Sequence, residues 1–508
     1  MLGILALAAS ATLSPGVTQS QVAAVIDALA PGDTLTLAAG DYPGIDLDLQ
    51  HKDGTGVAGT SSAHVTIAGT GDAHVIANAD QFQEGMRLRT GCAFIDVKNL
   101  HLSSKGGQTQ AGIFIDSGVH DVSITGNTIE DVTGIGIQAH SMSDVHDVLI
   151  EGNDIHDTGT NTGDGNNGGQ GFQAGGFDPS KATTNVFHIT LRHNAVHHIT
   201  GQEGDCIAFL YGVYGSTIED NVLWDCPRGV SAETENYGIT VYGSGVGHYT
   251  NAADDNVVRR NLVYQSAAVQ SGHSNVGIYV GPGTLVVNNV VVASNQGIAA
   301  RLESEASDMR NLSVVNNTVY DATDYAFSIR GCQNADASVI VTNNAFIAVQ
   351  PAGFGYRMPD PLGAMVAKAN YYSGQDYAEA AAPIMNKLSS APSAIFVNAS
   401  STIPGADFML AAASPLVDVG DPATAPSDDF DLATRPSGAG PDVGAYELRA
   451  DLSSHWALSL GLKGTAGTGT PGGGGPSSGG CGCDAAGAPS SNGWIAALGL
   501  FALRRRRR

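Results

Sequence analysis

The stretch "VSITGNTIE", residues 122–130, places one asparagine, Asn127, between two short apolar alternations. Val122 and Ile124 alternate with polar residues, and this period of two is typical of a β-strand with one buried face. Asparagine tolerates left-handed backbone angles better than most residues, so it suits a turn between two strands. The stretch therefore predicts a strand, a tight turn and a second strand.

The same arrangement occurs nine times along the chain, each time around one asparagine: Asn99, Asn127, Asn153, Asn194, Asn221, Asn261, Asn289, Asn317 and Asn344. Successive asparagines are 28, 26, 41, 27, 40, 28, 28 and 27 residues apart, so the period is about 27 residues and two units are longer. A unit of this length is too short for a strand and two helices but accommodates three short strands. We expect a solenoid in which each asparagine amide hydrogen-bonds to the equivalent asparagine one coil away.

This repeat resembles that of the right-handed parallel β-helix proteins, the pectin lyase-like fold of pectate lyases and polygalacturonases, over about residues 17–350. The resemblance implies an all-β, single-stranded, right-handed parallel β-helix of about 10–12 coils. The opening "VAAVIDALAPGDTLTL" is similar to the start of such proteins, which implies a capping helix from about Gln19 to Ala30. Residues 406–448 resemble their closing segment and are expected to cap the other end, where an uncovered strand edge would aggregate. The β-helix domain is thus expected to span residues 17–450.

The two ends of the chain differ in composition from this domain. Residues 1–16 combine an apolar run with the small residues Ala9-Ser10-Ala11, which predicts a signal peptide unless the true start lies upstream. Residues 451–480 are rich in glycine, serine and proline, which predicts a flexible linker.

Residues 481–508 begin with the pair Cys481 and Cys483, continue with a run of ten apolar or small residues and end in five arginines. Ten residues are too few for a membrane-spanning helix, which needs about 20. The order of these three parts resembles the C-terminal sorting tails of myxobacterial surface proteins. The resemblance implies export to the cell surface or outer membrane, with processing or lipidation at Cys481. The alternative is a disordered tail with accidental arginines.

The formal net charge of −25 argues against nucleic acid as a partner. The same field opposes acidic polysaccharides unless a cation such as Ca²⁺ bridges the carboxylates, whereas neutral or basic glycans meet no such barrier. The glycine-rich loop "DTGTNTGDGNNGG" supplies candidate Ca²⁺ ligands in Asp157, Asp164 and Asn166, although it lacks the spacing of an EF-hand.

Each coil contains another apolar segment, often with the pattern GIxI, and the loops around these segments vary most in length. Variable loops beside a rigid sheet are where solenoids form binding grooves. If the isoleucine-type positions point inward, the fifth residue of each segment points outward and forms one column: Asp116, Gln138, Gly175, Leu210, Glu233, Gly281, Arg301 and Arg330. We expect a sugar polymer to lie across this column.

Tyrosines in the loops beside the column, Tyr237, Tyr242 and Tyr249, are expected to stack on sugar rings or else to pack within the loops. The two arginines of the column also have an alternative role, as a solvated pair or a pair held by Glu303 and Glu305.

The segment "GDCIAF", residues 204–209, resembles the polygalacturonase motif GDDCIAI, and "CPRGVS" falls where that family has its second cysteine. The resemblance implies a disulfide between Cys206 and Cys226, the two cysteines of the domain that lie within one coil length of each other. Asp205 is kept, but Gly204 and Arg228 replace the other acid and the histidine of the family. Hydrolysis by paired carboxylates therefore lacks a partner here.

A second resemblance is to calcium-dependent polysaccharide lyases of the chondroitinase B and alginate lyase kind, which carry acids before a catalytic lysine. Glu203 and Asp205 match the acids, but Leu210 occupies the place of the lysine. β-Elimination needs a base, and Arg301 and Arg330 are the candidates. The remaining cysteines of the domain, Cys92 and Cys332, are many coils apart and are expected to be buried and reduced.

Together these features predict a monomeric protein that cleaves or binds polysaccharide, lyase-like or glycosidase-like, with Asp205, Glu233 and Arg301 nearest the chemistry. An alternative is an adhesion protein that uses the same groove without turnover. A third possibility is a structural protein of the cell surface.

Overall fold

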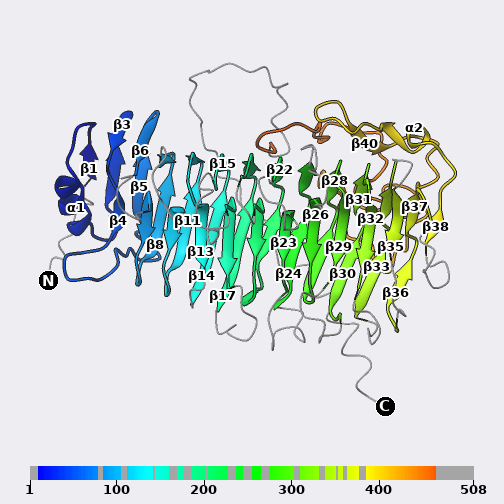
Figure 1. Ribbon diagram of the computed structural model, residues 1–508, viewed down its shortest axis with the longest axis horizontal. Coiled ribbons are helices and arrows are strands. Elements are labelled where there is room, and N and C mark those ends of the chain that lie inside the picture. The colour runs from blue at the N-terminus through cyan, green and yellow to red at the C-terminus, as the bar shows by residue number, and fades with distance from the viewer. Residues whose placement is uncertain are drawn as a thin grey trace, which may run out of the picture.

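The computed structural model describes residues 10–77, 84–104, 111–140, 144–159, 169–176, 185–200, 204–226, 236–243, 254–264, 275–301, 309–330, 338–349, 353–357, 363–376 and 385–464. In these residues the chain passes through three parallel sheets, A, B and C, once per coil, and the coils form one long stack (Figure 1). This arrangement is a single right-handed parallel β-helix, so the predicted fold class is confirmed.

Sheet A has 14 strands, which are β1 (Ser10–Leu13), β2 (Thr34–Leu37), β5 (Val65–Gly69), β8 (Ala93–Lys98), β11 (His120–Thr125), β14 (Val145–Glu151), β17 (Val186–Arg192), β20 (Val213–Tyr214), β21 (Thr217–Glu219), β24 (Asn256–Arg259), β27 (Thr284–Val287), β30 (Leu312–Val315), β33 (Val339–Thr342) and β36 (Val366–Lys368). Sheet B has 13 strands, which are β3 (Gly40–Pro43), β6 (Ala73–Ile76), β9 (His101–Ser103), β12 (Thr128–Glu130), β15 (Asp154–His156), β18 (Ala195–His197), β22 (Val222–Trp224), β25 (Leu262–Tyr264), β28 (Val290–Val292), β31 (Thr318–Tyr320), β34 (Ala345–Ile347), β37 (Tyr371–Ser373) and β38 (Asn386–Lys387).

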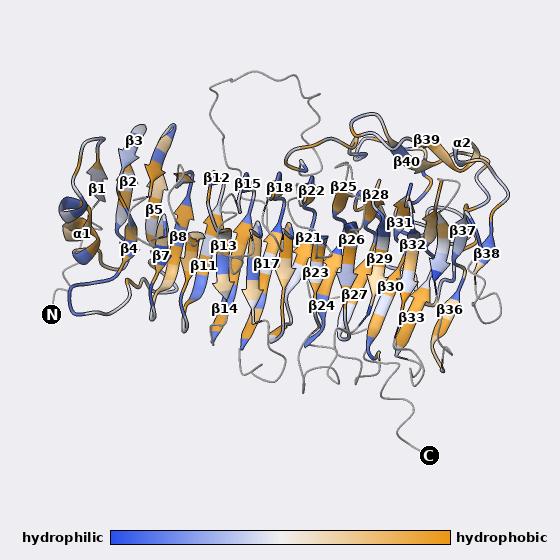
Figure 2. Cartoon of the chain, viewed as in Figure 1, coloured by the Kyte–Doolittle hydropathy of each residue, from blue (hydrophilic) through white to orange (hydrophobic). Residues whose placement is uncertain are grey.

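Sheet C has 11 strands, which are β4 (Leu47–Leu49), β7 (Met86–Leu88), β10 (Ala111–Ile115), β13 (Ile135–His140), β16 (Phe172–Gly175), β19 (Ile207–Phe209), β23 (Asn236–Val241), β26 (Asn275–Val280), β29 (Gln296–Ala300), β32 (Tyr325–Ile329) and β35 (Phe354–Arg357). In the described part of the chain this count gives 11 complete coils, which lies within the predicted range. Hydrophobic residues, orange in Figure 2, recur along the whole stack. The core is therefore continuous from coil to coil.

The stretch "VSITGNTIE", residues 122–130, lies in β11, a turn and β12. Val122 and Ile124 are buried, at 2% and 0% exposure, whereas Ser123 between them is not. The left-handed turn residue is Gly126, at φ +63°, and not the asparagine that follows it. The prediction placed the left-handed angle one residue too late.

The predicted asparagine ladder is present and runs from Asn127 to Asn370. In each rung the side-chain amide donates to the Oδ1 atom of the next asparagine, as from Asn194 to Asn221 at 2.9 Å. That same Oδ1 atom also accepts the backbone N–H of Asn194, at 3.0 Å. Each buried amide therefore joins two neighbouring coils by more than one hydrogen bond.

One member of the predicted ladder is wrong and one was missed. The backbone N–H of Leu100 donates to Asn127 Oδ1 at 3.0 Å, so Leu100 holds the ladder position of its coil. Asn99 precedes it and takes the left-handed turn position, at φ +56°. At the other end Asn344 donates to Asn370, at 2.8 Å, so the ladder continues by one coil.

Helix α1 (Gln19–Asp27) lies at the N-terminal end of the stack, as the capping prediction requires (Figure 1). Thr18 and Gln21 form a capping box, and Val22 and Ile26 are the buried residues of the helix. It ends earlier than expected because a residue before a proline disfavours helical angles, and Pro31 follows shortly. The helix therefore closes the first coil.

A paired strand, β1, lies before the predicted signal-peptide boundary at residue 16. Strand β1 begins at Ser10 and pairs with β2 in register, Ser10 opposite Thr34. Leu13 is 6% exposed, and its carbonyl accepts the Tyr42 hydroxyl at 3.0 Å. Residues 10–16 thus belong to the folded domain, while residues 1–9 lie outside the described part.

The closing segment, defined here as residues 406–464, does not cap the end of the stack as predicted. It returns along the outer face of sheet B toward β22, as the yellow and orange chain of Figure 1 shows. Its residues Phe408 and Val443 pack in one buried cluster with Trp224 and Tyr264 of sheet B. The reason is physical: this part of sheet B carries large apolar side chains on its outer face and needs a cover.

The predicted linker starts too early for the same reason. Lys463 is 6% exposed and its Nζ atom lies 2.9 Å from Asp220 Oδ1, in the turn between β21 and β22. It also donates to the carbonyl of Phe430 at 3.0 Å. Residues 451–464 therefore belong to the domain.

Three short elements lie around the start of the closing segment. Helix α2 (Pro392–Ile395) and strand β39 (Phe396–Asn398) precede it, and strand β40 (Asp407–Leu410), which pairs antiparallel with β39, begins it.

Thermal stability should fall between pH 6.5 and about 9 because of His455 in the closing segment. Hydrogen bonds to Asp407 and Asp431 raise its pKa from 6.5 to about 9. A raised folded-state pKa gives stability that is fully present below the unfolded value and is lost as the pH rises through the folded value. Melting curves across this range test the effect. A His455→Gln variant should lose it, whereas His188→Gln, with a largely exposed side chain, should keep it.

Among the residues described, no helix has the length and apolar composition needed to cross a membrane.

Candidate functional site

The strands of sheet C border the longest connections of the repeat. The chain runs from β15 at His156 to β16 at Phe172, and from β22 at Trp224 to β23 at Asn236. By contrast, β11 ends at Thr125 and β12 begins at Thr128. The prediction that insertions gather beside one sheet and spare the asparagine ladder is confirmed. Sheet C is therefore the sheet whose neighbouring loops are best placed to form a binding face.

The strand register changes two members of the predicted outward column. Gln138 pairs with Phe114 and Gln173, so it lies two residues before the column, whose place in that coil belongs to His140. In a later coil the strand of sheet C is β23, which begins after the segment that contains Glu233. The segment "GVSAE" lies outside the described residues, and it is the next segment, "NYGITV", that pairs with β19 and β26.

Tyr242 follows Val241, which pairs with Phe209 and Val280, so Tyr242 takes the column place expected for Glu233. Arg301 and Arg330 follow the paired residues Ala300 and Ile329, as predicted.

Four tyrosines form a cluster on the outer face of sheet C. The ring of Tyr279 on β26 lies 4.9 Å from that of Tyr237 and 5.9 Å from that of Tyr242. Tyr211 extends the cluster by one coil, with its ring 5.1 Å from Tyr242. Tyr237 and Tyr279 are buried, at 8% and 3% exposure, while Tyr242 is half-buried. Tyr237 lies on β23 and Tyr242 directly follows this strand, and both rings pack against Tyr279.

Three arginines continue this face beyond the tyrosines. The guanidinium of Arg301 lies over the ring of Tyr279, at 5.5 Å from its centroid. Arg330 is exposed on the next coil, and Arg357 on β35 lies over the ring of Tyr325 at 5.1 Å. We call the set Tyr211, Tyr237, Tyr242, Tyr279, Arg301, Arg330 and Arg357 the tyrosine–arginine face.

Asp324, just before β32, is the acid whose charge interacts with these three arginines. Burial raises the pKa of Asp324, and the positive charges of Arg357, Arg301 and Arg330 oppose that rise. A carboxyl group with a raised pKa beside cationic groups is suited to proton transfer or to the recognition of a charged ligand. The arrangement can therefore bind an anion through arginine and move a proton through Asp324.

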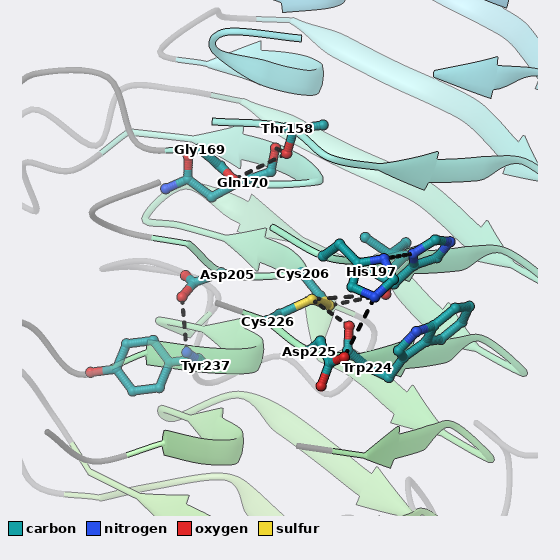
Figure 3. Close-up of a disulfide and its surroundings, with 12 residues drawn as sticks. Thr158, Gly169, Gln170, His197, Asp205, Cys206, Trp224, Asp225, Cys226 and Tyr237 are labelled. Atoms are coloured by element: carbon teal, nitrogen blue, oxygen red, sulfur yellow. Dashed lines mark hydrogen bonds and ion pairs between the residues drawn. A yellow bond between two sulfur atoms is a disulfide. The ribbon is translucent and has the colours of Figure 1, made fainter. Parts of the chain in front are cut away.

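Asp205 does not stand at the edge of a groove as predicted. It is 5% exposed, and it accepts the backbone N–H of Tyr237 at 3.2 Å and the Thr240 hydroxyl at 2.9 Å. Figure 3 shows its carboxylate directed at Tyr237 in the next coil. Both partners lie on β23, so Asp205 positions the strand that carries Tyr237 and leads directly into Tyr242.

The predicted disulfide between Cys206 and Cys226 is present, with the Cα atoms 5.5 Å apart. Cys206 directly precedes β19 of sheet C, whereas Cys226 follows β22 of sheet B. The bond, yellow in Figure 3, joins the start of β19 to the segment after β22, and both cysteines belong to the buried core. Cys92 is buried and free, as predicted.

Several predicted site residues lie outside the described residues: Glu203, Glu233, Tyr249, Asp164, Asn166, Glu303, Glu305, Cys332 and Cys481. Of the predicted Ca²⁺ ligands, Asp157 is described, and its Oδ2 atom lies 2.8 Å from His156 Nδ1. Its carboxylate therefore engages sheet B. The calcium prediction otherwise stays a prediction.

Sequence reasoning missed Tyr279, Asp324 and Arg357. Tyr279 is the fourth residue of the segment "GIYVG", residues 277–281, whereas the predicted column used only the fifth residue of each segment. Asp324 directly precedes β32 and Arg357 ends β35, and the sequence alone gave neither strand a register. A register fixed by the asparagine ladder would have aligned all three.

No family model and no curated protein matches the sequence. Solved structures with a similar fold include an alginate lyase from Paenibacillus sp. str. FPU-7, at 18% identity and a TM-score of 0.41, over 70% of this chain and 97% of that one. The pectate lyase Pel9A has 12% identity and a TM-score of 0.45, over 87% and 98%. A mannuronic acid-specific family 6 lyase from human gut microbiota has 14% identity and a TM-score of 0.44, over 75% and 91%. At such identities the site residues have to be assigned from this chain alone.

Proposed function

We propose that the protein binds an acidic polysaccharide along the tyrosine–arginine face. The observation that carries this proposal is the presence of three arginines on successive coils of sheet C, the first of which, Arg301, lies over Tyr279 of the tyrosine cluster. Of the four tyrosines, the half-buried Tyr242 can offer its ring to a sugar, while the three buried ones pack beneath it. Arginine guanidinium groups bind carboxylates in a bidentate manner. The protein as a whole is acidic, so a local group of arginines favours an anionic ligand at this place over the rest of the surface.

The strands of sheet C repeat about 4.8 Å apart, so column residues of successive coils are available to successive parts of an extended polymer. Calcium enters the proposal only as a cation that would reduce repulsion between the acidic protein and an acidic polymer.

Arg330→Gln should weaken binding of polygalacturonate or alginate by about tenfold, since a hydrogen bond to a charged group contributes about 1.5–3 kcal/mol. Arg330 is exposed, so the fold should not change. The matched control is Arg192→Gln, because Arg192 lies on sheet A, bonded to Glu151 at 2.8 Å. Titration calorimetry with each polymer and with a neutral glucan provides the measurement. Equal affinity in the two variants would refute the proposal.

The same preparations decide between an enzyme and a binding protein. Hydrolysis gives new reducing ends only, elimination also gives unsaturated products that absorb in the ultraviolet, and a binding protein gives neither. If turnover is found, Asp324→Asn should abolish it and leave binding in place.

We further propose that the protein is held at the cell surface through Cys481. Unchanged surface retention of a Cys481→Ala variant would reject this attachment.

A further inference from the structure

The outer face of sheet B carries a second group of functional side chains, away from the tyrosine–arginine face. Histidines and acids alternate on neighbouring strands there: His74, His101, Glu130, Asp154, His156 and His197. The closing segment covers this sheet from β22 onward in the described part of the chain. These six residues lie on the strands before that point, β6 to β18.

Strand geometry brings three of them to one place. Asp154 and His156 are separated by the fully buried Ile155, so both project from the outer face. His197 on β18 is directly opposite His156 in register. The rings of His156 and His197 are stacked 4.8 Å apart. One ligand atom from each of Asp154, His156 and His197 lies within 4.8 Å of the other two.

The distances approach those of a metal site. His197 Nε2 lies 3.0 Å from Asp154 Oδ1, and His156 Nε2 lies 3.4 Å from Glu130 Oε2. Ligands around a tetrahedral zinc ion, with bonds of about 2.0–2.1 Å, are about 3.3 Å from one another. His156 has to move toward Asp154 when an ion binds, and its partly exposed side chain allows this.

The other ring nitrogens have partners that orient the histidines. His156 Nδ1 lies 2.8 Å from Asp157 Oδ2, and His197 Nδ1 lies 2.7 Å from His198 Nδ1. Such contacts fix the tautomer of a ligating histidine and leave its other nitrogen for the metal. Trp224 stacks on His197, with ring centroids 3.9 Å apart, and holds that ring in place; Figure 3 shows the two side by side.

Ions can reach the group from solvent. The Asp154 side chain is 45% exposed, while those of His156 and His197 are 17% and 12% exposed. The second histidine group, His74 with His101 and Glu130, is less suited. Both nitrogens of His74 have neighbours outside that group, Ser103 Oγ at 2.7 Å and Asp41 Oδ1 at 3.3 Å, whereas Nε2 of His156 and of His197 faces an acid proposed as a ligand.

We propose that Asp154, His156 and His197 bind one divalent transition-metal ion, with Glu130 as the fourth ligand. Imidazole nitrogen prefers Zn²⁺, Ni²⁺ or Cu²⁺, whereas Ca²⁺ prefers sites made of oxygen. The ion bound here is therefore zinc-like, distinct from any calcium beside sheet C. The alternative is a hydrogen-bonded ladder of histidines and acids that takes no ion.

The test uses the full chain, freed of metal by a chelator and titrated with Zn²⁺ in a calorimeter. We expect one tight Zn²⁺ site per chain, and with Co²⁺ the absorption bands of a tetrahedral complex. His156→Gln and His197→Gln should each weaken Zn²⁺ binding by at least about 100-fold, since loss of even an outer-shell partner costs about 10–100-fold. Asp154→Asn leaves the ring stacking intact and should weaken binding by at least about tenfold.

The matched control is His146→Gln on sheet A. Its Nδ1 atom lies 2.8 Å from the carboxylate of the next residue, Asp147, as in the pair His156 and Asp157. The control should bind Zn²⁺ as the unchanged protein does. Binding that survives in both the His156 and His197 variants would overturn the proposal, as would an equal loss in the control. Loss in His101→Gln alone would assign the ion to the other group and also overturn it.

Discussion

Replacing Arg435 with methionine is expected to lower the free energy of unfolding by about 3–5 kcal/mol, the usual cost of breaking a buried ion pair by removing one partner. Arg435 and Glu447 both have fully buried side chains, and Nη1 lies 2.9 Å from Oε2. Arg435 also donates to the carbonyls of Asp442, Gly444 and Ala445. Methionine fills much of the volume but satisfies none of these acceptors.

The loss should appear first in the closing segment. Burial raises the pKa of Glu447, and the charge of Arg435 opposes that rise. Without Arg435 the carboxyl group should take up a proton more readily, so the loss of stability relative to the unchanged protein should be smaller at low pH than at neutral pH. Chemical denaturation followed by tryptophan fluorescence measures the loss, because Trp456 packs in this segment.

Two further variants test the cause. Arg435→Met combined with Glu447→Leu removes both charges and should be more stable than Arg435→Met alone, because no buried charge is left without its partner. Lys387→Met removes an exposed pair with Asp376 and should cost less than about 1 kcal/mol. A cost for Arg435→Met as small as that of Lys387→Met would contradict the account.

The sequence predicted the repeat well because its signals are local. Apolar alternation and the recurring asparagine act within a few residues, so the strands of sheets A and B were placed from short segments. The error at Asn99 has a local cause too. "VKNLHL" contains an asparagine beside the ladder position, and only pairing with β11 shows that Leu100 holds that position.

The parts that failed depend on contacts between distant segments. The closing segment was expected at the end of the stack, but Lys463 reaches Asp220, which lies 243 residues earlier in the chain. The candidate functional site on sheet C was harder still to predict. Tyr242 replaced Glu233 in the outward column because the long connection before β23 hides which apolar segment is the strand. The histidines of sheet B showed no metal-binding motif in the sequence, because their ligand atoms come together only when neighbouring strands pair.

Replacing Asn261 with alanine is the second change with a large expected effect, about 3 kcal/mol or more. Asn261 is fully buried in the middle of the ladder. Its Oδ1 atom accepts the backbone N–H and the side-chain amide of Asn221, both at 3.0 Å. Its own amide donates to the Ile218 carbonyl at 2.9 Å and to Asn289 Oδ1 at 3.0 Å. Each buried polar group left without a partner costs about 1–3 kcal/mol.

In a solenoid each coil contacts only its neighbours, so this loss should weaken the coils on either side of Asn261 and spare the ends. Limited proteolysis should then cut the variant near the middle of the stack at temperatures where the unchanged protein resists. Asn386→Ala is the control, because Asn386 is exposed at the edge strand β38 and its amide makes one hydrogen bond, at 3.2 Å, to the Asn370 carbonyl. If Asn261→Ala melts at the same temperature as Asn386→Ala, the ladder does not hold the coils together. Apolar packing alone would then have to account for the regular stack.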